Sequence, residues 1–283
     1  MPVKPKTAVK RLAPSSPARK EQVQSLIKGL TLLGAFSNAE TLGNAELVGR
    51  TGYPKATVSR LTSTLTALGY LRKDDGTRRF MMGTRLLGMG ASVERNIGLL
   101  RVARPFMEML ALETDMSISL GTRDRLGIVL LEMARPRNNR LIINSDAGTV
   151  LPMESTAIGL ACLAATAVNE KARLLEGLRK RHPQDWEQVR SRIASAHIEF
   201  LASGFVSSQK SWGRDVSAVA VPLRVRGYAD LFVFNCAGPS SQLSASLLKK
   251  ALGPRLCDVV ARIAAEMQRH PVVPLRPLSI HEA

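Results

Sequence analysis

The chain has 283 residues, with 40 Lys and Arg against 23 Asp and Glu, so its formal net charge is +17. This excess favours a polyanionic partner, because each Lys or Arg that neutralises a phosphate releases condensed counterions; a soluble protein that is merely basic is the alternative. The three cysteines, Cys162, Cys236 and Cys257, are widely spaced; they form neither a disulfide framework nor a metal pattern and favour a reducing cytoplasm. No apolar run reaches the length of a membrane span, so no membrane partner is expected.

The positive charge is concentrated near the N-terminus. Residues 1–85 carry 15 Lys and Arg and 5 Asp and Glu, a net charge of +10, which leaves +7 for the other 198 residues. Residues 1–20 contain six Lys and Arg, four prolines and no acidic residue, and such a segment cannot bury enough apolar surface to order itself. We therefore expect a disordered basic arm at residues 1–20, which either follows DNA phosphates or is only a solvated tail.

Two short helices are predicted after this arm. Apolar residues recur at three- and four-residue steps over residues 23–33, the spacing of an amphipathic helix. A second helix is expected over about residues 45–50. Gly52 then suits the left-handed residue that closes a helix, and Pro54 suits the first turn of the next one. The sequence therefore predicts a tight turn before a third helix.

The third predicted helix, over residues 54–68, has two contrasting faces. Val58, Leu61, Leu65 and Leu68 form one apolar stripe. The opposite face carries short polar and cationic side chains, which permit close approach to a DNA major groove while Lys and Arg reach phosphates or guanine edges. An ordinary solvent-exposed face has the same composition, so this helix alone does not distinguish a DNA-binding helix from a surface helix. The candidate DNA-binding residues on it are Lys55, Thr57, Ser59, Arg60 and Ser63.

A β-hairpin is predicted directly after this helix. Residues 70–72 and 78–82 are its expected strands, and the Asp-Gly pair at residues 75–76 marks the turn. Arg78 and Arg79 lie near the tip and are candidates for contacts with the flanking DNA backbone. Two helices, a tight turn, a polar-faced helix and a basic hairpin, in this order, predict a winged helix-turn-helix.

Many short segments, in one order from about residue 23 to about residue 267, resemble the IclR family of transcription regulators. No single segment is specific for this family, but the occurrence of all of them in the same order is. The matching segments are VQSL (23–26), GYPKATVSRL (52–61), Leu65, ALGYL (67–71), MGTRLL (82–87), LP (151–152), STAIG (155–159), GF (204–205), VAVP (219–222) and GP (238–239).

The resemblance implies a DNA-binding domain, a linking helix and an effector-binding domain with a GAF-like or profilin-like α/β (α+β) fold. It also implies a homodimer or tetramer and an effector that is a small organic or aromatic acid. The expected organisation after the arm is a winged helix-turn-helix at 21–83, a linker helix at 84–100, an effector-binding domain at 101–270 and a C-terminal tail at 271–283.

The residues beyond 100 themselves predict strands and helices without strict alternation, which favours a mainly antiparallel sheet. A helix is expected over residues 104–114, with Pro105 in its first turn. The expected strands are 116–120, 127–132, 140–144, 218–222 and 230–237, and the further helices are 157–168, one or two over 184–202, and 243–267.

In the family, the effector lies against the sheet near the start of the helix that here begins around Ala157. A helix N-terminus presents free N–H groups and partial positive charge, which suit a carboxylate, and apolar walls would hold the rest of a small acid. For any one of the apolar candidates, a place in the core is the better explanation. Many members carry an acidic pair where this chain has Ser208 and Gln209, so a larger or more aromatic anion is expected. The residues carried over are Ile142, Met153, Ala157, Ile158, Ser208, Ala218, Asn235 and Ala237.

A cytoplasmic enzyme attached to a DNA-binding domain is the alternative from another class. The four histidines show no metal-ligand spacing, Cys236 has no His and acidic partner nearby in sequence, and there is neither a phosphate loop nor a dinucleotide fingerprint. We therefore expect no catalytic residue, metal or cofactor. The sequence favours a repressor of a catabolic operon that binds double-stranded operator DNA under control of a small organic acid, with an effector-dependent activator as the alternative.

Overall fold

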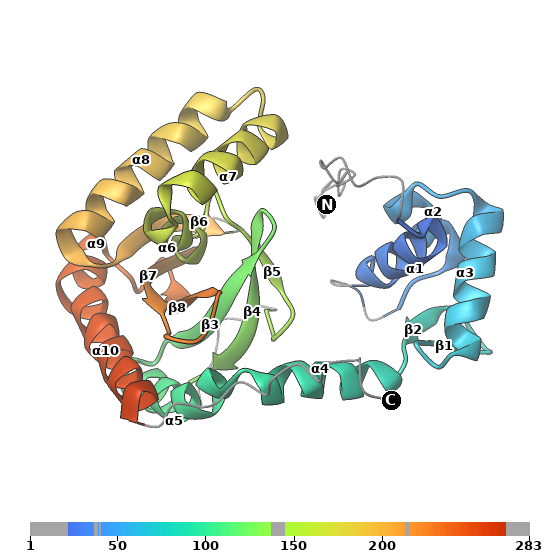
Figure 1. Ribbon diagram of the computed structural model, residues 1–283, viewed down its shortest axis with the longest axis horizontal. Coiled ribbons are helices and arrows are strands. Elements are labelled where there is room, and N and C mark those ends of the chain that lie inside the picture. Colours follow the sequence, from blue (N-terminus) through green and yellow to red (C-terminus); the bar gives the residue numbers. More distant parts are fainter. Residues whose placement is uncertain (1–21, 37–38, 40, 137–144, 213–214, 270–283) are drawn as a thin grey trace. The chain divides into compact units, whose positions relative to one another are not determined.

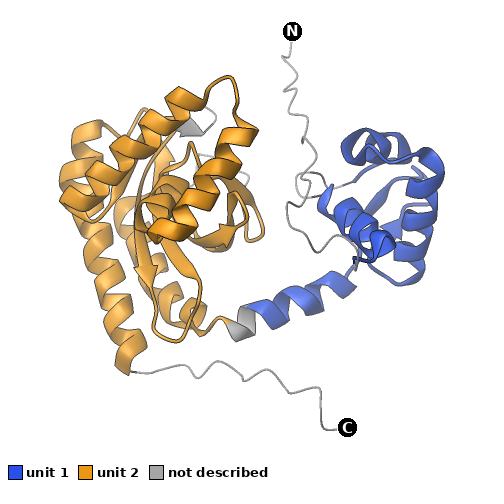
Figure 2. Ribbon diagram, turned by 45° about the horizontal axis from the view of Figure 1, so that its top comes forward, with its two compact units in different colours: residues 1–93 blue, residues 94–283 orange. Residues whose placement is uncertain are grey.

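The computed structural model describes residues 22–269 apart from residues 37–38, 40, 137–144 and 213–214 (Figure 1). The chain divides into two compact units, residues 1–93 and residues 94–283 (Figure 2). The boundary falls within residues 84–100, the segment expected to be a linker helix. The expected arm, the C-terminal tail and the expected strand at 140–144 lie outside the described residues.

The first unit is a small helical domain with a two-stranded antiparallel sheet. Its core is built from Leu32, Leu47, Val58 and Phe80, which are almost completely buried, and this confirms the predicted winged helix-turn-helix. Its elements are α1 (Gln24–Gly34), α2 (Asn44–Thr51), α3 (Lys55–Ala67), β1 (Leu71–Lys73), β2 (Phe80–Met82) and α4 (Arg85–Asn96), which crosses the boundary between the units.

The turn between α2 and α3 follows the sequence signals. Gly52 has a φ of 68°, the left-handed conformation that glycine adopts without steric cost, and its N–H donates to the Val48 carbonyl at 2.8 Å. Pro54 lies just before the first turn of α3. The turn therefore sets the direction in which α3 leaves α2.

The second unit is a six-stranded, fully antiparallel sheet with the order β5-β4-β3-β8-β7-β6. The mainly antiparallel mixed fold is therefore confirmed. Its elements are α5 (Gly98–Thr114), β3 (Ser117–Asp124), β4 (Gly127–Ala134), β5 (Val150–Pro152), α6 (Ala157–Ala165), α7 (Val168–Arg181), α8 (Trp186–Ser203), β6 (Val206–Trp212), β7 (Val216–Arg224), β8 (Leu231–Pro239), α9 (Ala245–Leu247), a π-helical turn (Leu248–Leu252) and α10 (Gly253–Arg269).

Helices cover both faces of this sheet: α5 and α10 pack on one face, and α6 packs on the other with α7 and α8 outside it (Figure 1). Alternation along β8 supplies both cores, because successive side chains point to opposite faces. Phe232 and Phe234 pack on the α5–α10 side, whereas Val233 and Ala237 pack on the α6 side. The sheet is therefore buried on both faces at its centre.

Several predicted element boundaries were wrong. Helix α5 begins at Gly98 rather than at residue 104, because Leu99 and Leu100 are buried and extend it, and Pro105 therefore lies inside the helix. Helix α6 ends at Ala165 rather than at residue 168. Thr166 is extended and its hydroxyl donates to the Cys162 carbonyl at 2.7 Å, which separates α6 from α7. Helix α7 and strands β5 and β6 were not predicted.

Candidate DNA interface and effector pocket

One face of α3 is exposed to solvent. Val58, Thr62 and Leu65 are buried, and the Thr62 hydroxyl donates to the Val58 carbonyl at 3.0 Å. The candidate residues Lys55, Ser59, Arg60 and Ser63 are exposed, and Thr57 is half-buried. Neither Lys55 nor Arg60 forms an ion pair with another described residue. These two cations are therefore available to an external anion.

The two arginines of the hairpin have different surroundings. The Arg79 guanidinium pairs with the Glu46 carboxylate at 2.8 Å and donates to the Thr41 hydroxyl at 2.9 Å and the Thr41 carbonyl at 3.0 Å. The Gly43 N–H also donates to Glu46 at 2.8 Å; this bond, together with Arg79, lowers the pKa of Glu46. Arg79 thus ties the hairpin to the start of α2, whereas Arg78 is exposed, with a φ of 56°.

The turn of the hairpin is stiffened by one aspartate. The Asp74 carboxylate accepts hydrogen bonds from both the backbone N–H and the hydroxyl of Thr77, each at 2.7 Å, and these bonds lower the pKa of Asp74. The chain then places Arg78 directly after this turn. A cation on a fixed, exposed turn suits a contact with a DNA phosphate.

A pocket in the second unit lies over the centre of the sheet on its α6 side. Side chains paired across β3, β8 and β7 share one face of a sheet, and here they are small or polar. Large side chains at the intervening positions, such as Ile118 and Phe234, point to the other face, which leaves a depression. The two rows that line up across these strands are Ser117, Ala237, Ala218 and Ser119, Asn235, Ala220.

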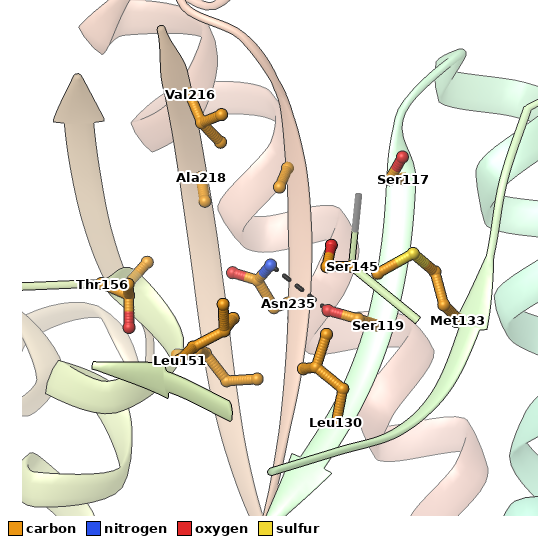
Figure 3. A pocket seen from close by; sticks show the side chains of 13 residues that line it. Ser117, Ser119, Leu130, Met133, Ser145, Leu151, Thr156, Val216, Ala218 and Asn235 are labelled. Carbon is orange, nitrogen blue, oxygen red and sulfur yellow. Dashed lines mark hydrogen bonds between the residues drawn. The ribbon is translucent and has the colours of Figure 1, made fainter. Parts of the chain in front are cut away.

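The polar groups on this floor come from neighbouring strands. Ser119 and Asn235 point toward each other, and the Asn235 Nδ2 donates to the Ser119 hydroxyl at 3.4 Å (Figure 3). Asn235 is only 7% exposed and Ser119 only 2%. Because buried polar groups need hydrogen-bond partners, the remaining donor and acceptor positions of this pair suit a ligand that carries a polar group.

The walls come from β4, β5, α6 and the start of β7. The N-cap Thr156 accepts from the Gly159 N–H at 3.2 Å and donates to the Pro152 carbonyl at 2.6 Å. The pocket encloses about 470 Å³ of empty space, counting the part open to solvent. The lining residues are Ser117, Ser119, Leu130, Met133, Ser145, Leu151, Thr156, Ala157, Ile158, Val216, Ala218, Asn235 and Ala237.

Five of the eight residues expected to bind an effector line this pocket: Ala157, Ile158, Ala218, Asn235 and Ala237. Met153 is not among the lining residues, because it is completely buried in the core beside α6. Ser208 pairs with Ala218 on the edge strand β6 but is also not a lining residue. Ile142 lies outside the described residues.

Sequence reasoning missed the serines of the pocket and the residues of its β4 and β5 walls. A signal for them was present. The segment Ser117-Ile118-Ser119-Leu120-Gly121 alternates small or polar residues with large apolar ones, which indicates a strand with one crowded and one open face. The polar residues that were missed are Ser117, Ser119, Ser145 and Thr156.

The chemistry of the pocket is that of a binding site with neutral donors. None of its thirteen described lining residues is ionisable. On the opposite face of the sheet, burial raises the pKa of Cys236 to about 12, and burial within α6 raises the pKa of Cys162 to about 11, so both thiols stay protonated at neutral pH. In the part of the chain that the structure describes, no three His, Cys, Asp or Glu side chains gather as metal ligands do.

The first unit exposes one face of α3 beside a basic hairpin, and the second unit is a separate domain that contains a pocket. These features define a transcription regulator that carries a DNA-binding domain and an effector-binding domain. Family profiles agree: the IclR helix-turn-helix domain matches residues 25–75, and the C-terminal domain of the bacterial transcriptional regulator IclR matches residues 91–254. The chain therefore belongs to the IclR family, as the sequence predicted.

Individual relatives match over most of their length. The regulator TsaQ1/TsaQ2 of Comamonas testosteroni is 49% identical over 87% of this chain and 89% of its own. KdgR of Escherichia coli K12 is 26% identical over 88% of this chain and 95% of its own. The crystal structure of an IclR family regulator from Brucella abortus superposes with a TM-score of 0.76 at 37% identity, covering 87% of this chain and 93% of that one.

No helix among the described residues is both long enough and apolar enough to pass through a bilayer.

Proposed function

We propose that this regulator is a cytoplasmic repressor of a catabolic operon, without catalytic activity, whose affinity for its operator is controlled by a small aromatic acid. The pocket over the sheet carries the proposal, because a neutral polar floor, apolar walls and a helix N-terminus suit a ring that bears a carboxylate. We further propose that the winged helix-turn-helix spans residues 21–83, the linker residues 84–100 and the effector-binding domain residues 101–270. Activation instead of repression is the second candidate, since the position of the operator relative to the promoter decides the sign of control.

For the operator, the proposal assigns direct readout to the exposed face of α3. Arg60 and Lys55 contact base edges or phosphates in the major groove, and Arg78 on the hairpin contacts the flanking backbone. The sequence assigned Arg79 to the flanking backbone as well; because its guanidinium is bound to Glu46 and Thr41, we instead propose that Arg79 supports these contacts by holding the hairpin against α2. The residues that make the closer contacts are Thr57, Ser59 and Ser63.

For the effector, the carboxylate lies at the start of α6. The first N–H groups of a helix have no partner within it and carry partial positive charge. Apolar side chains such as Leu130, Met133 and Leu151 then contact the ring, and Asn235 with Ser119 binds a polar substituent. A structural neighbour of the same fold, an IclR homolog from Microbacterium hydrocarbonoxydans that is 18% identical, is complexed with 4-hydroxybenzoate.

Calorimetric titration with pyruvate, glyoxylate, benzoate and 4-hydroxybenzoate tests the effector class. We expect the aromatic acids to bind at least about tenfold more tightly, because the apolar walls contribute roughly 25 cal/mol per Å² of ring surface that they cover. Ala237→Leu fills the floor of the pocket and abolishes this binding, whereas Ala194→Leu on the exposed side of α8 leaves it unchanged. Binding of the two- and three-carbon acids alone contradicts the proposal.

A homodimer, or a tetramer built from two such dimers, is the proposed assembly. Within the first unit, α1 and the residue just before it expose an apolar stripe, in which Val23 is 62%, Leu26 60% and Leu30 59% exposed. On α4, Leu87 is 72% and Val93 56% exposed. Monomeric proteins rarely leave apolar side chains in such continuous rows, and two copies of a winged helix-turn-helix match the two half-sites of a palindromic operator.

Leu26→Glu tests this assembly. Because the stripe would have to bury an unpaired carboxylate, we expect the dissociation constant of the dimer to rise about 100-fold. Sedimentation velocity at several protein concentrations measures it. The same helix offers a control in Lys28→Glu, which changes charge outside the stripe. Identical sedimentation of wild type and Leu26→Glu would place the interface elsewhere.

A further inference from the structure

We propose that Glu154 and His182 form a positioning pair that holds the first turn of α6 against the effector pocket and thereby sets the affinity of that pocket. The proposal rests on the effector function proposed above. Neither residue lines the pocket, so their effect is exerted through the backbone of the loop between β5 and α6.

Glu154 is held at two points by helices outside the pocket. The His182 Nε2 lies 2.9 Å from the Glu154 Oε1, and His182 directly follows α7. The Arg192 guanidinium, on α8, donates to the Glu154 backbone carbonyl at 3.2 Å. Side chain and main chain of one loop residue are therefore both tied to the outer helices.

The backbone transmits this restraint to the pocket over a short path. Thr156, two residues after Glu154, caps α6 and lines the pocket together with Ala157. A Cβ atom on Gly159 would lie 2.3 Å from the Met153 carbonyl oxygen, so the first turn of α6 is in backbone-to-backbone contact with the residue that precedes Glu154. A shift of the loop must therefore shift the start of α6.

The buried carboxylate is poorly explained by a role in stability. Glu154 is only 7% exposed, and its Oε2 atom is buried without a hydrogen-bond partner among the described residues. Burying an unpaired carboxylate oxygen costs free energy, and apolar residues of similar volume often replace a buried pair at no cost to stability. The geometry instead fits a residue whose task is to hold a loop in one position.

His182 is itself well anchored, as a positioning partner must be. Its backbone N–H donates to the Leu178 carbonyl at 2.9 Å. The preceding Arg181 donates to the Leu126 carbonyl at 2.9 Å, which ties the end of α7 to the turn between β3 and β4. Through the end of α7, the pair therefore connects the loop before α6 to the turn between β3 and β4.

The variants Glu154→Met and His182→Leu remove the hydrogen bond and keep the side-chain volume similar. We expect each to raise the dissociation constants of benzoate and 4-hydroxybenzoate about tenfold, the equivalent of a single hydrogen bond, and the double variant to add little to either. Hydrogen exchange at the Gly159 and Leu160 amides becomes faster. The free energy of unfolding does not fall in Glu154→Met and the double variant, which remove the buried carboxylate, whereas His182→Leu leaves that carboxylate buried without a partner and lowers it. Glu154→Gln, which can still bond to His182, stays within about threefold of wild type.

Glu176→Met is the matched control, because Glu176 forms an exposed ion pair with Lys180 on α7 at 3.2 Å; it leaves binding and exchange unchanged. The proposal is overturned if Glu154→Met and His182→Leu leave both readouts unchanged, or if the affinity of Glu154→Met for the acids falls only in step with its free energy of unfolding. Should Glu154→Met not fold, the proposal is tested by comparing the acid affinity and the exchange rates of His182→Leu with those of Glu154→Gln. If wild type binds neither acid, the proposed effector class fails, and the exchange rates still test the pair.

Discussion

The largest expected effect on DNA binding comes from Arg60→Ala. We expect it to lower affinity for the operator by at least about 30-fold, because a bidentate interaction with a base edge is worth roughly 1–3 kcal/mol and each protomer of the proposed dimer would make one through Arg60. Affinity for random duplex DNA falls much less, since Arg60 then contributes only its charge. Fluorescence anisotropy with both duplexes, the operator being selected from random sequences by the wild-type protein, measures the ratio.

Arg78→Ala serves as the control for this experiment. Arg78 is exposed on the hairpin and is expected to bind only phosphate. Its removal therefore weakens binding to both duplexes by a similar factor and lowers the slope of log affinity against log salt by about one for each phosphate that is no longer neutralised. Equal reductions on specific and random DNA from both variants would contradict the assignment of base readout to Arg60.

Gly159→Ala is expected to have the largest effect on the effector-binding domain. The added Cβ would lie 2.3 Å from the carbonyl oxygen and 2.4 Å from the Cα of Met153, and these backbone atoms cannot rotate away as a side chain does. We expect the free energy of unfolding of this domain to fall by about 3 kcal/mol, the upper range for overpacking a buried site. Urea denaturation followed by circular dichroism measures the change.

Gly177→Ala provides the comparison within the same domain. The glycine also lies in a helix, and its added Cβ would lie 3.0 Å from the Cδ1 of Leu126, the mobile end of a side chain. Alanine also has the higher helix propensity, by up to about 1 kcal/mol. A near-neutral effect is expected; a destabilisation as large as that of Gly159→Ala would show that any alanine on these helices destabilises the domain.

The DNA-binding unit was predictable from sequence because its signals are local. Gly52 and Pro54 mark the turn, and the apolar residues of α3 recur with the helical period. The second unit was less so. Strand β6 lies at the edge of the sheet, and its residues 207–211 (SSQKS) lack the apolar alternation by which strands are recognised. The break between α6 and α7 depends on the extended backbone of Thr166, with neither glycine nor proline to mark it.

The candidate site divides in the same way. Lys55 and Arg60 are exposed where the helical period places them. The pocket, however, forms between strands that are distant in sequence: Ser119 and Asn235 become neighbours only when β3 pairs with β8. The same holds for Arg79, whose two partners, Thr41 and Glu46, lie more than 30 residues before it. Pairing across such separations is set by the tertiary fold and cannot be derived from local patterns.

The alternation along β8 separates two kinds of evolutionary change. Phe232 and Phe234 maintain the hydrophobic core behind the sheet, while Ala218, Ala237 and Ser117 determine the depth of the chamber in front of it. Substitutions at the three pocket positions can therefore change which compound binds without disturbing the packing of the two phenylalanines. A combinatorial library restricted to these three positions is therefore a rational starting point for converting the regulator into biosensors for other compounds.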